Sequence, residues 1–180
     1  MGDDMEYITL VNENDEIIGK EEKMKAHVDG ILHRAFSIIV VNDNNEMLIH
    51  RRNKEKYHSG GMLTNTCCSH PRYGEKLSDA IHRRLIEEMG FDCEMVEVFK
   101  FLYKKEFDYG LTEHEYDHVF IGRYNGSDIF PDKKEVDEYK WIKLNDLIND
   151  IKNNSDEYTH WFKIIMKEIK ERELNVFEVI

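Results

Sequence analysis

One stretch of the chain, which begins at Cys68, constrains the fold more than any other. It sets a thiol two residues before the imidazole of His70 and then runs into apolar residues at helical spacing. Along residues 79–89 the apolar side chains recur three and four positions apart, the period of an amphipathic helix. The pattern predicts a helix there, with Ser78 as its N-cap and Gly90 as its end. A thiol and an imidazole at the entry of a helix are hard to explain as packing and indicate a functional loop.

Patterns typical of strands and helices surround this unit. Apolar runs bounded by turn residues predict strands over 7–11, 17–20, 35–41, 47–50, 93–103, 113–124 and 139–143. Helical spacing predicts a short helix over 145–151 and a longer one over 158–172, with Trp161, Ile164, Ile165 and Ile169 on its buried face. The polar residues 51–61 predict a loop. Strands flanked by helices predict an α/β fold with a mixed sheet, organised as one domain over residues 1–180.

The net charge of the chain restricts the classes of molecule that it can bind. A formal net charge of −12 argues against nucleic acid and against an anionic membrane, because their phosphates repel such a surface. A small anionic ligand is still compatible, since it needs only a local pocket of Lys and Arg. No apolar run approaches the roughly 18 residues that span a bilayer, and the acidic start at residues 1–4 differs from a signal peptide. Three cysteines without a spacing pattern predict free thiols in a reducing cytoplasm.

The predicted helix carries two arginines at 83–84 and two glutamates at 87–88. With Glu75 upstream, this register resembles the Nudix box: a Gly, a Glu six residues on, and then Arg-Glu-apolar-x-Glu-Glu-x-Gly-apolar. Ser69 replaces the leading Gly, and Arg84 replaces the Glu of Arg-Glu. The alternative is a solvated helix whose arginines and glutamates form ion pairs four residues apart.

The arginine at position 84 changes the chemistry that this box predicts. Hydrolases of the Nudix class need several helix carboxylates to hold metals and to activate a water. An arginine there removes an acidic ligand and adds a phosphate clamp. The sequence therefore predicts a site that holds a diphosphate without cutting it.

A second group of candidate residues combines carboxylates with imidazoles. Alternation along the predicted strand places Glu113 and Glu115 on one face and His114 on the other. Two carboxylates on an inward face repel each other unless a cation lies between them, whereas an exposed polar face is the alternative. Three imidazoles and two carboxylates would make a suitable N/O set for Mg²⁺, Mn²⁺ or Zn²⁺. They belong to His27, His33, His70, Glu113 and Glu115.

In these motifs the chain closely resembles the type I isopentenyl-diphosphate isomerases, a flavin-independent family with a Nudix-like fold. The resemblance extends from about residue 7 to residue 161. It rests on three motifs in this order: Leu32-His33-Arg34-Ala35-Phe36-Ser37, Asn65-x-Cys67-Cys68-Ser69-His70-Pro71 and Glu113-x-Glu115. Gly60 and Leu63 stand where some relatives have Pro and Trp, which implies a different pocket wall.

The resemblance implies a role for each candidate residue. The ligands of the divalent metal fall on His27, His33, His70, Glu113 and Glu115. The catalytic pair falls on Cys68 and Glu115, with Tyr103 and Trp161 as assisting residues. The cations that bind the diphosphate fall on Lys23, Arg52, Lys56 and Arg84. Glu88 falls on the carboxylate that holds the Mg²⁺ brought by the substrate.

The resemblance also implies the activity, the interconversion of isopentenyl and dimethylallyl diphosphate by a monomer that uses no flavin. An acid protonates the alkene and a base removes a proton two carbons away, through a tertiary carbocation or something near it. Cys68 and Glu115 would act from opposite faces of the substrate, and the sequence leaves open which of them is the acid. Two alternatives stay open: a Nudix hydrolase that cuts a diphosphate, and a non-catalytic module that binds a metal or a diphosphate.

Overall fold

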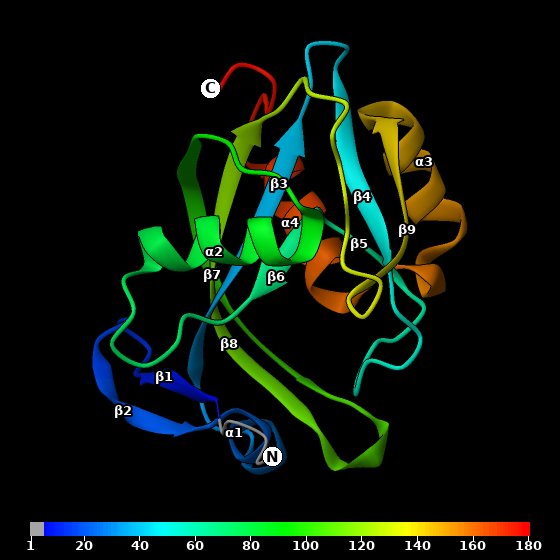
Figure 1. Ribbon diagram of the computed structural model, residues 1–180. Coiled ribbons are helices and arrows are strands. Elements are labelled where there is room, and N and C mark those ends of the chain that lie inside the picture. The colour runs from blue at the N-terminus through cyan, green and yellow to red at the C-terminus, as the bar shows by residue number, and fades with distance from the viewer. Residues whose placement is uncertain (1–5) are drawn as a thin grey trace.

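The computed structural model describes residues 6–180, so the acidic start at residues 1–4 lies outside the described part (Figure 1). Within the described residues nine strands form one mixed sheet. The strands are β1 (Tyr7–Val11), β2 (Ile17–Glu22), β3 (His33–Val41), β4 (Glu46–Arg52), β5 (Leu63–Thr64), β6 (Cys67–Ser69), β7 (Met95–Glu106), β8 (Thr112–Arg123) and β9 (Val136–Lys143). The helices are α1 (Lys23–Asp29), α2 (Leu77–Met89), α3 (Leu144–Asn153) and α4 (His160–Glu171). The predicted α/β class with a mixed sheet is confirmed.

β3 is the central strand, and all its residues are buried except Arg34, which is half-buried. β8 runs parallel to it along its whole length, from the His33–Glu115 pair to the Val41–Arg123 pair. On its other edge β1, β6 and β4 pair antiparallel with successive parts of the strand. Because side chains alternate along a strand, β3 supplies apolar groups to both faces of the sheet.

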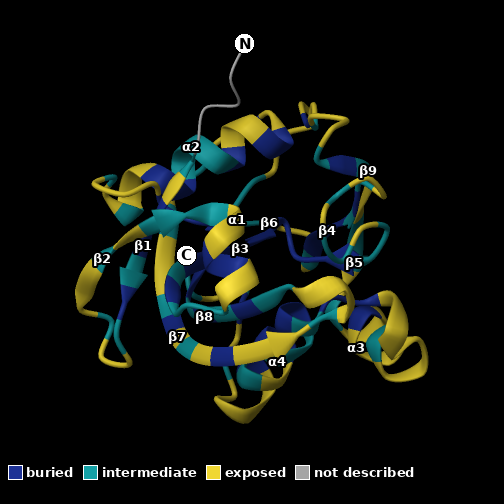
Figure 2. Ribbon diagram, turned by 90° about the horizontal axis from the view of Figure 1, so that it is seen from below, coloured by how far each residue is buried: buried dark blue, intermediate teal, exposed yellow. Residues whose placement is uncertain are grey.

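Two apolar cores lie on the two faces. On one face α2 covers Phe36, Ile38 and Val40, and on the other α4 covers Ile39 and Val41. In Figure 1 α2 lies in front of the sheet and α4 behind it, and in Figure 2 the central strands are dark blue while the outer turns of the helices are exposed. Burying both faces holds β3, β6 and β8 rigidly, and these strands carry the site described below.

The helix that carries the box residues begins earlier than its sequence predicts. It starts at Leu77 and not after Ser78, because the backbone N–H groups of Asp79 and Ala80 already donate to the carbonyl oxygen of Lys76. The predicted N-cap is therefore wrong, and the Ser78 hydroxyl contacts Asp79 instead. The predicted end is confirmed. Gly90 has φ of 77° and donates its N–H to the carbonyl oxygen of Ile86, a left-handed end that suits glycine.

Other boundaries differ from the predictions because contacts distant in sequence decide them. The last helix begins at His160, since Tyr158 lies extended beside Leu63 in an isolated parallel bridge. β7 runs on to Glu106 and β9 already begins at Val136, each paired with a long neighbour. No helix within residues 6–180 is long and apolar enough to cross a membrane.

The short helix α1 was not predicted, because it buries only two side chains and has no apolar period. The Glu22 carboxylate caps its start by accepting hydrogen bonds from the N–H groups of Met24 and Lys25, at 2.9 and 2.8 Å. Gly30 ends it at φ of 64° and turns the chain toward β3. This turn brings His27 on α1 next to His33 at the start of β3, with ring centroids 4.7 Å apart.

Candidate active site

A pocket of about 460 Å³, its open mouth included, lies where α1, α2 and α4 meet the ends of the central strands. Ten of the residues predicted from the sequence line it: Lys23, Arg52, Lys56, Cys68, His70, Arg84, Glu88, Glu113, Glu115 and Trp161. Three others, His27, His33 and Tyr103, are buried and contact the lining carboxylates. Gly60 and Leu63 do not line this pocket, and Leu63 packs in the core toward α4. The expected difference from the pocket wall of relatives stays a prediction.

Three imidazoles and one carboxylate form what we call the imidazole cluster: His27, His33, His70 and Glu115, all buried. The Glu115 Oε1 atom lies 3.0 Å from Nε2 of His70, 3.5 Å from Nε2 of His33 and 3.9 Å from Nε2 of His27. Segments far apart in the sequence supply these groups, since α1, β3, the end of β6 and β8 contribute one residue each. The cluster therefore depends on the complete fold.

The protonation of two of these rings follows from their hydrogen bonds. His27 Nδ1 donates to the carbonyl oxygen of Lys23, and His33 Nδ1 donates to that of Ile31, both at 2.7 Å. The Nε2 atoms of both rings are left without a hydrogen-bond partner although they are buried. Bare nitrogen lone pairs that face a carboxylate oxygen repel it unless a cation lies between them. Backbone hydrogen bonds of this kind also orient metal-ligating histidines. The cluster fits a divalent metal ion.

Glu113 lies beside this cluster on the same face of β8, as the alternation predicts, but outside the four residues that converge most closely. The Tyr103 hydroxyl, on β7, links the two carboxylates: it lies 3.0 Å from Glu113 Oε2 and 2.8 Å from Glu115 Oε2. Burial and then the charge of Glu115 raise the pKa of Glu113 well above its ordinary value. Burial also acts to raise the pKa of Glu115, but the neighbouring rings of His33 and His70 outweigh it and lower the pKa.

The two adjacent cysteines on β6 face opposite sides of the sheet. Cys67 is buried in the core under α2, whereas Cys68 lines the pocket. Burial raises the pKa of Cys68 to about 12, against the opposing influence of Arg52. Arg52 donates a hydrogen bond from Nη1 to Cys68 Sγ at 3.6 Å. A pKa near 12 keeps the sulfur a thiol at neutral pH, and it lines the same pocket as Glu115.

Trp161, at the start of α4, gives the pocket an aromatic wall. Its ring is 3% exposed, and its Nε1 donates to Asn65 Oδ1 at 3.1 Å, which fixes the orientation of the indole. The Arg52 guanidinium lies over the ring, 5.2 Å from its centroid. An indole face in this position already accommodates one cation.

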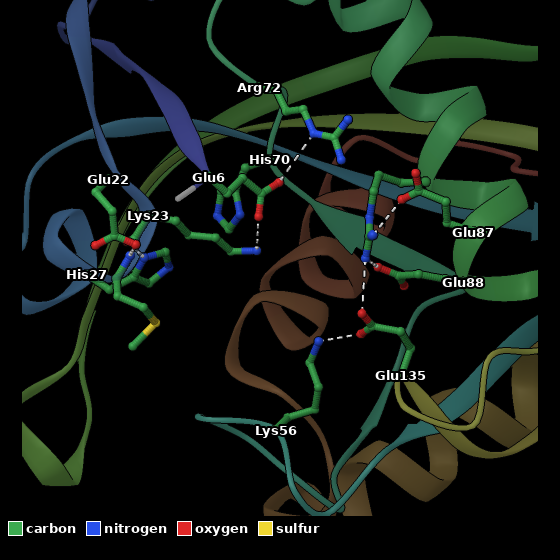
Figure 3. Close-up of polar contacts among 12 residues, drawn as sticks. Glu6, Glu22, Lys23, His27, Lys56, His70, Arg72, Glu87, Glu88 and Glu135 are labelled. Carbon is green, nitrogen blue, oxygen red and sulfur yellow. Dashed lines mark hydrogen bonds and ion pairs between the residues drawn. The ribbon is translucent and has the colours of Figure 1, made fainter. Parts of the chain in front are cut away.

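Four basic side chains on the pocket wall form what we call the cation group: Lys23, Arg52, Lys56 and Arg84. Three of them are paired with carboxylates of the chain (Figure 3). Lys23 Nζ lies 3.2 Å from Glu6, Arg84 contacts Glu88, and Lys56 contacts Glu135. The ion pairs four residues apart on α2 that the alternative predicts are present as well, but the helix is not simply solvated, because Glu88 is buried. Of these two pairs, the one formed by Arg84 and Glu88 lies in the pocket wall.

Comparisons with known proteins agree with this geometry. The family described as NUDIX domain matches residues 31–162. Isopentenyl-diphosphate Delta-isomerase 2 of Aromatoleum aromaticum is 46% identical over 157 residues, which cover 87% of this chain and 82% of that protein. Isopentenyl-diphosphate Delta-isomerase 2 of Photorhabdus laumondii is 44% identical over 96% of this chain and 97% of that protein. The chain belongs to the isopentenyl-diphosphate Delta-isomerase family.

Solved structures of other proteins superpose on this member of the isomerase family. The protein DR0079 of Deinococcus radiodurans superposes with a TM-score of 0.68 at 18% identity, over 83% of this chain and 90% of that one. The MutT protein of Methanosarcina mazei superposes with a TM-score of 0.65 at 16% identity, over 80% of this chain and 96% of that one. At such low identity these likenesses show the fold alone.

Two acidic or basic groups of this isomerase-family site escaped the sequence analysis. His58 lies on the loop after β4, with Nδ1 3.2 Å from Glu113 Oε1, and no motif marks it. Asp117 follows Glu115 on the same face of β8, so strand alternation could have found it. The Ser37 hydroxyl donates to Asp117 at 2.8 Å, and burial, followed by the charge of Glu115, raises the pKa of Asp117 well above its ordinary value.

Proposed function

We propose that this chain interconverts isopentenyl diphosphate and dimethylallyl diphosphate for isoprenoid biosynthesis. The observation that carries the proposal is the placement of Cys68 and Glu115 on one pocket whose rim carries the cation group. A thiol and a carboxylate can each give or accept a proton, and the cations suit a diphosphate. The names of the relatives support the same activity.

The reaction moves one hydrogen across a three-carbon allylic unit. One group adds a proton to the terminal alkene carbon, and the other removes a proton from the carbon next to the oxygen-bearing carbon. Cys68 is held as a thiol by burial, and Glu115 is oriented by the Tyr103 hydroxyl at 2.8 Å. The two groups exchange the donor and acceptor roles when the reaction runs in reverse. An alkene is a very weak base, so holding it against a positioned acid lowers the barrier.

The carbocation formed between the two proton transfers needs a negative surface and no water. The indole of Trp161 can stabilise it through its π face by roughly 0.5–2 kcal/mol. Tyr103 is buried, and its hydroxyl is engaged with Glu113 and Glu115. We propose that it assists by holding these carboxylates. Substrate that fills the pocket and displaces its water would also keep water from capturing the cation.

Binding energy comes from the diphosphate, which lies away from the reacting carbons. Lys23, Arg52, Lys56 and Arg84 would hold its oxygens, and Glu88 would hold a Mg²⁺ that arrives with it. Arg84 takes the place of a carboxylate in the Nudix box, so one ligand for a hydrolytic metal is missing from α2. These residues bind the diphosphate and leave its phosphorus–oxygen bonds intact.

The imidazole cluster would hold the resident metal through His27, His33, His70 and Glu115, with Glu113 beside them. Three imidazole nitrogens favour Zn²⁺ or Mn²⁺ over Mg²⁺ in such a site. A bound cation would stabilise the deprotonated carboxylates and fix their orientation. We further propose that the chain acts as a single domain and a monomer in the cytoplasm, where its three free thiols stay reduced.

Proton NMR of isopentenyl diphosphate mixed with the purified protein and Mg²⁺ tests the activity. We expect the signals of the dimethylallyl isomer to appear, and no phosphate to be released from nucleoside diphosphates. The opposite pattern, phosphate release without isomerisation, would assign the chain to the hydrolases. The paired glutamates at 87–88 keep that outcome worth testing.

A further inference from the structure

Two members of the cation group meet on a single carboxylate that the sequence analysis did not single out. Glu135 lies just before β9, and its Oε2 contacts Lys56 while its Oε1 lies 3.4 Å from Arg84 Nη2. The side chains of Lys56, Arg84 and Glu135 are only 20%, 17% and 23% exposed. Figure 3 shows the side chains of Lys56 and Glu135 pointing toward each other, joined by a dashed line. The arrangement is a half-buried bridge between two positive charges.

Backbone hydrogen bonds fix the position of this carboxylate relative to both cations. The N–H of Asp132 donates to the carbonyl oxygen of Glu88 at 3.0 Å, which ties the segment before β9 to α2. The backbone N–H of Asn53 donates to the carbonyl oxygen of Glu135 at 2.9 Å, and the side-chain amide of Asn53 donates to the carbonyl oxygen of Lys133 at 2.6 Å. The same short segment therefore joins the helix that carries Arg84 and the loop that carries Lys56.

The charges explain why such a bridge is needed. Lys56 has a flexible stem on a loop, and the nearby guanidinium groups of Arg52 and Arg84 would repel its ammonium group toward solvent. Burial acts to raise the pKa of Glu135, but the charges of Lys56 and Arg84 outweigh it and lower the pKa. The carboxylate is therefore ionised at neutral pH and offsets the repulsion.

We propose that Glu135 is a positioning residue of the diphosphate site, whose carboxylate holds Lys56 and Arg84 side by side so that both reach the same anion. The inference rests on the proposed function for the identity of that anion. The opposite role on the same contacts is competition of the carboxylate with the diphosphate for the two cations. The two roles predict opposite effects on affinity when the charge is removed.

The experiment measures the binding of inorganic diphosphate with Mg²⁺ to the full chain by calorimetry, and the KM and kcat for isopentenyl diphosphate. Glu135→Gln is expected to weaken diphosphate binding and to raise KM about tenfold, with kcat changed less than about twofold. Glu135→Asp, which keeps the charge, is expected to recover part of the affinity. Glu138→Gln, the same change at an exposed position of β9, is expected to leave the affinity unaltered.

A double-mutant cycle shows whether Glu135 acts through Lys56. Glu135→Gln is expected to weaken diphosphate binding by some factor in the wild-type chain. In a Lys56→Met background, the same substitution is expected to weaken it by less than half of that factor. A merely structural role would give the same effect in both backgrounds. Equal effects, or tighter diphosphate binding by Glu135→Gln, would overturn the inference.

Failure of the proposed function is distinguishable from failure of this inference. If the chain binds diphosphate and loses affinity on Glu135→Gln but produces no dimethylallyl isomer, the positioning role stands and the isomerase proposal falls. If the isomer forms but Glu135→Gln leaves both diphosphate affinity and KM unchanged, the isomerase proposal stands and the positioning role falls. If the wild-type chain binds no diphosphate, the positioning role falls as well.

Discussion

The imidazole cluster and the cation group lie at one pocket, but their charges and lone pairs are compensated in different ways. In the imidazole cluster, buried nitrogen atoms of His27 and His33 face a carboxylate and have no hydrogen-bond partner. In the cation group, Lys56 and Arg84 are already paired with carboxylates of the chain. The first arrangement needs a cation from outside, whereas in the second the chain's own carboxylates balance part of the positive charge and hold the cations where a diphosphate can reach them.

Burial separates the two regions further. The side chains of His27 and His33 are 0% exposed, so water cannot satisfy their lone pairs. Lys56 and Arg84 keep 20% and 17% of their side-chain surface exposed, so water screens their ion pairs and a ligand can reach them. We expect the resident metal to be held tightly and the diphosphate to come and go.

The largest effect is expected from the thiol, which belongs to neither region. Cys68→Ala should lower turnover about 10³-fold or more, because it removes one of the two proposed proton-transfer groups. Metal content and the unfolding temperature should stay unchanged, since Cys68 contacts no member of the imidazole cluster within hydrogen-bond distance. Isomerisation assays of Cys68→Ala and of the control Cys93→Ala check this. Near-normal turnover of Cys68→Ala would sink the mechanism.

The next effect sharpens the contrast between the regions. His33→Ala should weaken binding of the resident metal by at least about 10- to 100-fold, the range typical of losing a group that only supports a metal ligand, while Arg84→Met should leave it unchanged. Competition with a chelating dye measures the affinity directly. Equal metal affinity of His33→Ala and the wild-type protein would show that the imidazole cluster is not a metal site.

A substitution of Arg84 tests the role of the cation group. Arg84→Met should raise KM for isopentenyl diphosphate about 10- to 100-fold, because a charge-assisted hydrogen bond contributes about 1.5–3 kcal/mol. Arg84→Lys should raise KM by less than Arg84→Met does, because lysine keeps the positive charge but lacks the planar guanidinium group. Steady-state kinetics at fixed Mg²⁺ measure both. A fall in kcat with KM unchanged would argue that Arg84 acts on the reacting carbons and not on the diphosphate.

Much of this contrast was predictable from the sequence. The alternation along residues 113–117 predicts that Glu113 and Glu115 share a face, and the helical spacing predicts α2. The convergence of His27 with His33 was implied by the family resemblance but by no local pattern, because it depends on the cap of α1 and the left-handed turn at Gly30. Glu135 was missed for a related reason: it meets Lys56 across 79 residues, and no local pattern marks it.

The N-cap shows where local rules fail. Ser78 suits a cap, but the helix starts at Leu77, two residues before the predicted start at residue 79, where the chain leaves the turn after Gly74. The start of α4 likewise follows from the bridge between Leu63 and Tyr158, a tertiary contact. Positions set by periodicity are thus readable from sequence, whereas element ends and convergent side chains depend on packing.

The smallest effect concerns an ion pair outside the pocket, between Glu75 and Arg83, with N···O of 2.6 Å. The Arg83 hydrogen bond lowers the pKa of Glu75 from 4.5. A carboxylate with a lowered folded-state pKa contributes stability above its unfolded pKa and loses it as the pH falls through the folded value. Glu75→Gln should therefore destabilise the fold by about 0.5 kcal/mol at pH 7 and by less as the pH falls below 4.5. Urea unfolding at several pH values measures it, and a constant difference would contradict the assignment.

The central claim is that one pocket, with a metal at the imidazole cluster, moves protons onto and off a five-carbon diphosphate. Incubation of isopentenyl diphosphate with the protein in heavy water, followed by NMR, tests it most directly. We predict deuterium in the dimethylallyl methyl group, no incorporation after the metal is removed by chelation, and recovery when the metal is restored. Incorporation at an unchanged rate in metal-free protein, or none in the metal-loaded protein, would contradict the account.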